Sequence, residues 1–204
     1  MKYALSLAIL LGIMPLSLRA DLILNEFHYD NIGGDTNEFI EVVTTGGESV
    51  ADIAIELYNG SNSSTYGGVL DSMSSGFEDH GILGDGNRYL SWTLPSNGLQ
   101  NGAPDGFALV FNGNVVEFLS YEGTFTAAGG TAVGLTSTDI GLSQSNSTTL
   151  QSSSIQRESF GTDWFETSGF NSKGAVNAVP EPSSFALLTL VSTCSVAYLR
   201  RRDT

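Results

Sequence analysis

Short runs in which apolar and polar residues alternate recur along the middle of the chain, and they constrain its fold more than any other feature. Two runs, DIAIELY and RYLSWTL, place three apolar residues each on one face: Ile53, Ile55 and Leu57 in the first, and Leu90, Trp92 and Leu94 in the second. A period of two is typical of a strand with one buried face. No ten-residue segment between the two ends has a convincing helical stripe, so we expect an all-β domain with Trp92 in its core.

Five further strands are expected, separated by clusters of Gly, Asn, Ser and Asp that favour turns. They cover residues 22–28, 38–44, 106–111, 115–121 and 153–158. The segments DGFALVF and VVEFLSY should form a hairpin, because Asn112, Gly113 and Asn114 between them tolerate the positive φ of a tight turn. About seven short strands indicate a β-sandwich rather than a parallel sheet. The Ser, Thr and Gly tracts at 61–66 and 136–154 are expected to be surface loops.

The charge of the chain excludes one class of partner. Its 204 residues carry a formal net charge of −14, and most of the cations lie near the ends, at Lys2, Arg19, Arg200, Arg201 and Arg202. The acidic middle would repel a phosphate backbone, so we expect no nucleic-acid partner. The hydrophobic content of 41% can supply a core. The only cysteine, Cys194, lies near the C-terminal end, so the domain should hold together by packing without a disulfide.

The first twenty residues are typical of a secretory signal peptide. Lys2 precedes an apolar run over 3–14, and Ala20 stands where a signal peptidase would cut. We therefore expect export of the protein, with residues 1–20 as the signal, 21–178 as the domain and 179–204 as a separate C-terminal segment.

The C-terminal segment combines three features in a fixed order. Pro180, Glu181 and Pro182 come first, an apolar helix is expected over 185–199, and the basic cluster Arg200, Arg201 and Arg202 follows. Fifteen helical residues span about 22 Å, which is short for a bilayer core of about 30 Å. The basic end should stay on the cytoplasmic side of the inner membrane.

This segment resembles the PEP-CTERM sorting signal of Gram-negative envelope proteins. The resemblance implies recognition by an exosortase, a membrane enzyme, and delivery to the cell envelope or to extracellular polysaccharide. The protein would then be anchored in the inner membrane, either transiently or permanently, through the apolar helix.

The segment LILNEFHYDNIGGDTNEFIEV offers two kinds of chemistry. Glu26, His28 and Asp30 are spaced two apart, so an extended strand would place them on one face, as an acid/base or metal site needs. No catalytic signature accompanies them, and His80 falls in a separate predicted loop. The alternative is a calcium loop, because the oxygen ligands that Ca²⁺ prefers are present at Asp30, Asp35, Asn37 and Glu38. Asp and Asn are also ordinary turn residues.

The same segment resembles the lamin-tail domain, an immunoglobulin-like β-sandwich of nuclear lamins and of secreted bacterial proteins, some of which also carry nuclease or phosphatase domains. The matching residues are LNEFHYDN at 24–31, Asp35, EFIEV at 38–42, DGFALV at 105–110, VEFLSYEG at 116–123, GLTSTDIG at 134–141 and GAVN at 174–177. The resemblance spans residues 22–177 and implies an immunoglobulin-like fold without established catalytic residues. We expect no attached catalytic domain, and residues 61–77 match no part of the family pattern.

These observations predict an exported, non-catalytic binding or structural module of the cell envelope that associates with extracellular polysaccharide or surface proteins. No cofactor is expected, with calcium as the alternative. The candidate recognition residues are Glu26, His28 and Trp164, the last of which belongs either to the core or to an aromatic platform for sugars. The rival hypothesis is a metal-dependent hydrolase, or a nuclease-associated module, that uses Glu26, His28 and Asp30.

Overall fold

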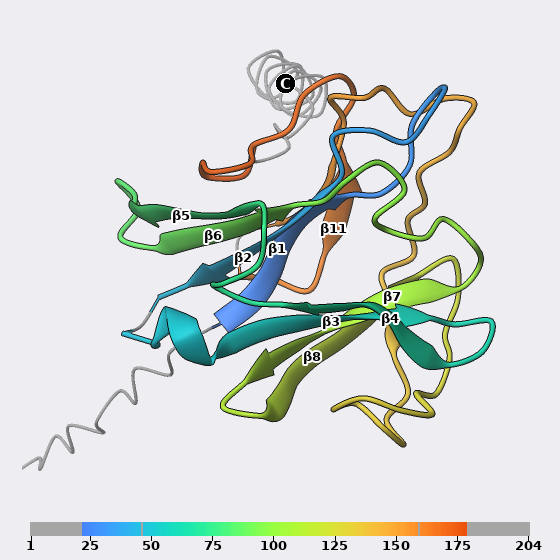
Figure 1. The fold of residues 1–204 in the computed structure, drawn as a ribbon. Helices are drawn as coiled ribbons and strands as arrows, with labels where there is room; N and C mark the ends of the chain where they lie inside the picture. Colours follow the sequence, from blue (N-terminus) through green and yellow to red (C-terminus); the bar gives the residue numbers. More distant parts are fainter. Residues whose placement is uncertain (1–21, 46, 159, 179–204) are drawn as a thin grey trace, which may run out of the picture.

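The computed structural model describes residues 22–45, 47–158 and 160–178, which form an all-β domain of two facing sheets (Figure 1). The six-stranded sheet has the order β11-β10-β1-β2-β6-β5, and the five-stranded sheet has the order β4-β3-β7-β8-β9. The strands of the first sheet are β1 (Leu22–His28), β2 (Phe39–Thr44), β5 (Phe77–Ile82), β6 (Arg88–Thr93), β10 (Ile155–Arg157) and β11 (Trp164–Glu166). Those of the second are β3 (Ile53–Asn59), β4 (Ser64–Leu70), β7 (Asp105–Phe111), β8 (Asn114–Tyr121) and β9 (Thr138–Asp139). A single-turn 3-10 helix, Val50–Asp52, precedes β3.

The main core lies where the two sheets face each other. The alternating residues of β3 and β6 point into it as predicted, and Trp92 is fully buried, with its indole Nε1 donating to the Asp71 carbonyl at 2.8 Å. The aromatic rings of Phe27, Phe107 and Tyr121 also meet there. Burial of this apolar surface is the main stabilising contribution in a domain that holds no disulfide among its described residues.

A bulge in β1 decides which of its side chains enter the core. Leu24 pairs with Val42 and Glu26 pairs with Glu41, so one extra residue, Asn25, is accommodated between them. Strict alternation from Leu24 would turn Glu26 inward. Because of the bulge, Phe27 packs in the core instead, and Glu26 lies on the other face of the sheet, which residues 172–178 cover.

The hairpin between β7 and β8 is confirmed, with Asn112 and Gly113 at φ 50° and 71°. Other expectations were wrong. Ser64–Leu70, partly expected as a loop, is strand β4, and His80 lies in β5 rather than in a loop. The strand expected over 153–158 covers only Ile155–Arg157, and β11 was not predicted. These strands lie at or near sheet edges. A segment with little apolar alternation can be a strand there, because backbone hydrogen bonds to a neighbouring strand hold it in the sheet.

Several sequence predictions concern residues outside the described ranges. These are the signal peptide, the motif Pro180, Glu181 and Pro182, the apolar helix over 185–199, and the basic end Arg200, Arg201 and Arg202. Within residues 22–178, apart from 46 and 159, no helix has the length and apolar character needed to cross a membrane.

Candidate functional site

Two buried carboxylates, Glu26 of β1 and Glu41 of β2, pair directly across the two strands. The two residues are 1% and 0% exposed, and they lie on the face of the six-stranded sheet away from the main core. We call residues 172–178, which cover this face, the strap. Like charges opposite each other on a sheet are destabilising unless donors or protons compensate them, so the strap has to supply donors here.

The strap supplies those donors from its backbone and side chains. Ser172 donates to Glu26 through its backbone N–H at 2.8 Å and its hydroxyl at 2.7 Å. The Gly174 backbone N–H donates to Glu41 at 2.5 Å. Gln156 of β10 adds a bond from its Nε2 to Glu26 at 3.1 Å, and its Oε1 accepts from the Ala178 backbone N–H at 3.1 Å. The carboxylates therefore fasten the C-terminal part of the domain to its central strands.

Burial raises the pKa of both carboxyl groups. The pKa of Glu41 rises to about 8, first because of desolvation and also because Glu26 lies nearby, while the Gly174 bond opposes the rise. Desolvation raises the pKa of Glu26 as well, against the bonds from Ser154 and Ser172. Both groups therefore hold their protons to a higher pH than an exposed carboxyl group does.

His80 packs against this strap. Its Nε2 lies 2.9 Å from the Ser91 hydroxyl oxygen, and a Cβ placed on Gly174 would come within 2.6 Å of its Nδ1. Gly174 also has a φ of 76°, which a residue with a side chain adopts only under strain. The second histidine of the chain thus lies under the strap, away from His28.

His28 and Asp30 make hydrogen bonds that do not involve Glu26. His28 is fully buried, and its Nε2 lies 3.2 Å from Oδ1 of Asn31, which holds the turn after β1. Desolvation lowers the pKa of His28, so its ring is neutral at pH 7. Asp30 follows the end of β1, and its backbone N–H donates to Gln144. His28 and Asp30 both lie against Gln144, whereas Glu26 bonds to Ser172 and Gln156, so Glu26 does not join them in one cluster.

The side chains of the acidic turn, residues 30–38, also bond to several different partners. Asp30 and Asp35 lie close together, and desolvation with the Asp35 carboxylate raises the pKa of Asp30 to about 6. In the amide orientation that satisfies both groups, Asn146 donates to the two carboxylate oxygens of Asp30 at 2.6 Å. Asp35 accepts a bond of 3.0 Å from Asn101.

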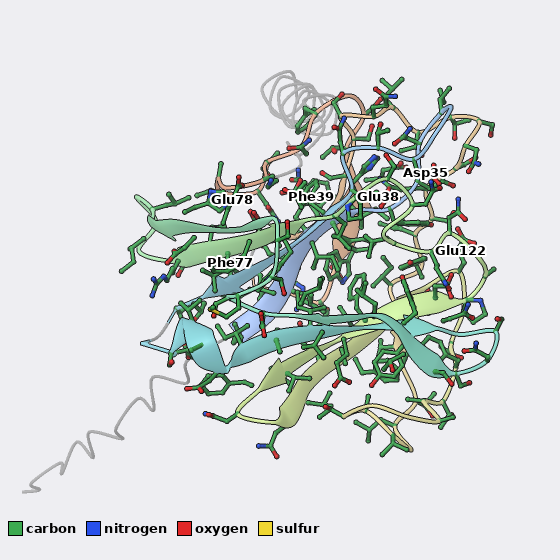
Figure 2. The ribbon with its side chains drawn as sticks, viewed as in Figure 1. Asp35, Glu38, Phe39, Phe77, Glu78 and Glu122 are labelled. Atoms are coloured by element: carbon green, nitrogen blue, oxygen red, sulfur yellow. The ribbon has the colours of Figure 1, made fainter. Side chains whose placement is uncertain are left out.

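Glu38 and Asn37 are engaged elsewhere. Glu38 accepts from the backbone N–H groups of Gly98 and Leu99 at 2.5 and 3.0 Å, and burial raises its pKa to about 6. Asn37 donates a long bond of 3.5 Å to the Gln151 carbonyl. Figure 2 shows Asp35 and Glu38 at the loop end of the molecule, far from Glu78. Within the described ranges, no group of three or more His, Cys, Asp or Glu is placed to hold a metal ion.

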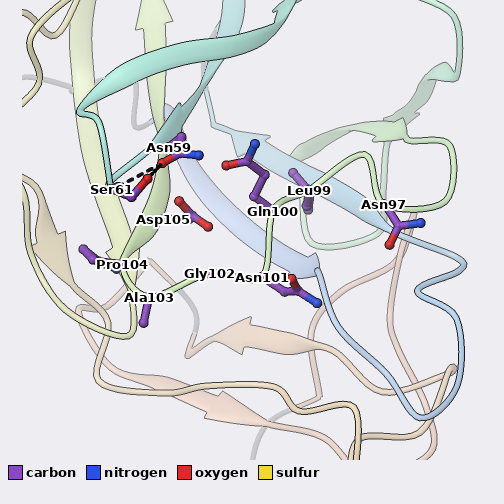
Figure 3. A pocket seen from close by; sticks show the side chains of 10 residues that line it. All are labelled: Asn59, Ser61, Asn97, Leu99, Gln100, Asn101, Gly102, Ala103, Pro104 and Asp105. Carbon is purple, nitrogen blue, oxygen red and sulfur yellow. Dashed lines mark hydrogen bonds between the residues drawn. The ribbon is translucent and has the colours of Figure 1, made fainter.

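A pocket that the sequence did not predict opens beside these loops (Figure 3). Its volume is about 260 Å³, and it lies between the end of β3 and the loop that enters β7. Amide side chains dominate its lining, at Asn59, Asn97, Gln100 and Asn101, with Ser61 and Asp105 beside them. The pocket offers donors and acceptors with a single carboxylate, which suits a neutral polar ligand. Two loops distant in sequence build it, so no local motif could have indicated it.

Trp164 occupies an intermediate environment. It lies on the edge strand β11, half-buried, with its ring edge-on to Phe27 at a centroid distance of 5.8 Å. The guanidinium carbon of Arg157 lies 4.7 Å from the ring centroid, within cation–π range. The ring therefore borders the core on one side and reaches the surface on the other.

Comparison of the chain with models of protein families, with curated proteins and with solved structures finds no match. The lamin-tail and PEP-CTERM resemblances therefore rest on the residues quoted for them.

Proposed function

We propose that the chain is an exported, non-catalytic binding or structural module with an immunoglobulin-like fold of the lamin-tail type. A PEP-CTERM segment carries it to the cell envelope through signal peptidase and an exosortase. There it associates with extracellular polysaccharide or with surface proteins.

One observation carries the non-catalytic part of this proposal. The buried acidic groups that a hydrolase would need are used as fasteners, since Glu26 and Glu41 hold the strap and Glu38 holds the loop at Gly98 and Leu99. A general acid or base must instead direct its carboxyl group at a substrate in an accessible cleft.

The binding part is supported by the loop end of the domain, where the amide-lined pocket lies. Loops carried on a rigid β scaffold are common binding elements. The low positive charge of the described region argues for neutral ligands over polyanions.

The test uses the exported full chain, purified in detergent from producing cells. It is incubated with the extracellular matrix of those cells, either untreated or freed of protein by protease. Retention on the protease-treated matrix supports polysaccharide binding, and retention on the untreated matrix alone supports a protein partner. Absence of retention on both would refute the binding module.

A further inference from the structure

A second cavity lies where the edges of the two sheets meet, and Trp164 forms part of its wall. Its volume is about 390 Å³, within the range of roughly 300–1,000 Å³ that is typical of small-ligand sites. Strands β8 and β9 contribute one side, and β10 with the segment leading into β11 contributes the other. The lining residues that matter here are Glu117, Leu119, Thr138, Asp139, Arg157 and Trp164.

Arg157 is a buried hydrogen-bond donor, and not all of its N–H groups have a close acceptor. Its side chain is 7% exposed, and its Nη2 donates to Glu117 at 2.8 Å. Its Nη1 makes only a long bond of 3.4 Å to the Gly161 carbonyl. The Nε is buried and has no hydrogen-bond partner within the described part of the chain. Nη1 carries two N–H groups and makes only the single long bond to Gly161, so it can still donate to an oxygen acceptor in the cavity.

The charges around the cavity disfavour an anion. Glu117 neutralises Arg157 and also accepts from the Leu24 backbone N–H at 2.7 Å, so this pair is held in place from both sheets. The remaining charged group in the lining is the Asp139 carboxylate, which is exposed. A phosphate or carboxylate ligand would meet this net negative charge, whereas a hydroxyl could donate to Asp139.

The cavity also has an apolar wall, which comes from Trp164 and Leu119. A ligand that suits it needs an apolar face for that wall and hydroxyl groups for Asp139, Thr138 and Arg157. A pyranose ring has this combination, because its C–H groups gather on one face while its hydroxyls lie around the rim.

An added peptide strand fits this place less well. The two edges that border the cavity belong to β9, with two residues, and to β11, with three. Strand addition draws its affinity from a row of backbone bonds, which edges of this length do not provide.

We propose that the cavity between β8, β9 and β10 binds one neutral hexopyranose unit of an extracellular polysaccharide. Trp164 and Leu119 supply the apolar wall, Arg157 donates to a ring or hydroxyl oxygen, and Asp139 accepts from a hydroxyl. This assignment rests on the proposed binding function and names its ligand class and site.

The experiment measures the affinity of the full chain in detergent for the protease-treated matrix polysaccharide of producing cells, separated into neutral and acidic fractions. Three variants are compared with wild type. Trp164→Ala removes the wall, Asp139→Ala removes an exposed acceptor, and Asp52→Ala is a control with the same change in charge at a residue that does not line the cavity. Melting temperatures verify folding, and Asp139→Ala keeps the test valid if Trp164→Ala fails to fold.

We expect wild type and Asp52→Ala to bind the neutral fraction equally. Trp164→Ala should lose about tenfold or more in affinity, as for an aromatic contact, and Asp139→Ala about tenfold, as for a lost hydrogen bond to a charged group. Unchanged affinity in Asp139→Ala and Trp164→Ala would overturn the cavity assignment and leave the binding function standing. A preference for the acidic fraction, or binding only to protein in the untreated matrix, would also overturn it. Absence of wild-type binding to any matrix preparation would refute the proposed function together with this site.

Discussion

Asn25 and Asn177 exchange two side-chain amide hydrogen bonds, each of 3.0 Å, although 152 positions separate them in the sequence. Asn25 is the extra residue of the bulge in β1, and Asn177 ends the GAVN motif of the strap. The Asn177 amide also donates to the Asn25 and Arg157 carbonyls, at 3.1 and 2.9 Å. The bulge and the strap therefore form one structural unit, in which the bulge presents the groups that the strap binds.

Replacing Asn177 with Ala should lower the free energy of unfolding by about 1–3 kcal/mol, because buried partners on Asn25 and Arg157 lose their donor. Chemical denaturation of the full chain measures this. Asn171→Ala is the matched control, since the Asn171 amide makes a single exposed bond of 3.4 Å. Equal stability of the two variants would contradict the role given to Asn177.

The melting temperature should fall as the pH rises from about 4.5 to 8. Burial raises the pKa of Glu41 to about 8 and those of Asp30 and Glu38 to about 6, so the folded state binds these protons more tightly than the unfolded state. Stability from such groups is complete below the unfolded pKa and is lost as pH rises through the folded pKa. Calorimetry across this range measures the slope.

Glu41→Gln should flatten that slope most clearly between about pH 7 and 8, where Asp30 and Glu38, with a pKa of about 6, have lost most of their protons and Glu41 has not. Glu56→Gln is the control, because hydrogen bonds from Thr131 and Tyr58 lower the pKa of Glu56 despite its partial burial and so remove it from this range. An unchanged slope in Glu41→Gln would show that Glu41 does not hold its proton in the folded protein.

His28→Ala should leave retention on the matrix unchanged, because His28 is buried and bonded to Asn31. The full chain should not hydrolyse simple phosphodiesters or esters, with either divalent metals or EDTA. Turnover by the wild type that disappears in a folded His28→Ala variant would establish the hydrolase that uses Glu26, His28 and Asp30 in place of our proposal.

Calcium should not change the melting temperature, because no group of three or more His, Cys, Asp or Glu in the described part of the chain is placed to hold a metal ion. A ligand that binds only the folded state must raise its stability. A higher melting temperature in millimolar Ca²⁺ than in EDTA, lost in Asp30→Asn, would establish the calcium loop.

The sequence predicted the strands that bury one full face, such as β3 and β6, because their apolar alternation follows from contact with the core. It also predicted the Asn112 and Gly113 turn, where local backbone preferences decide. The segment STYGGVL of β4 has no such alternation, and its strand conformation comes from pairing with β3.

The site was less predictable for a related reason. The spacing of Glu26, His28 and Asp30 suggested one cluster. The partner of Glu26, Ser172, lies 146 positions away in the sequence, where no local pattern could indicate it. Trp164 could not be assigned from its neighbours either, since its surroundings depend on Phe27 and Arg157 from other strands.

The attachment of the strap also determines where a mechanical load would enter the domain. A pull on the chain beyond Ala178 would first reach Asn177 and Ala178, and through them Asn25 of β1 and Gln156 of β10. These strands lie inside the six-stranded sheet, with β11 and β2 on either side of them. Tension would thus be shared by several hydrogen-bonded strands at once, which favours a domain that resists unravelling from the C-terminal side of residue 178.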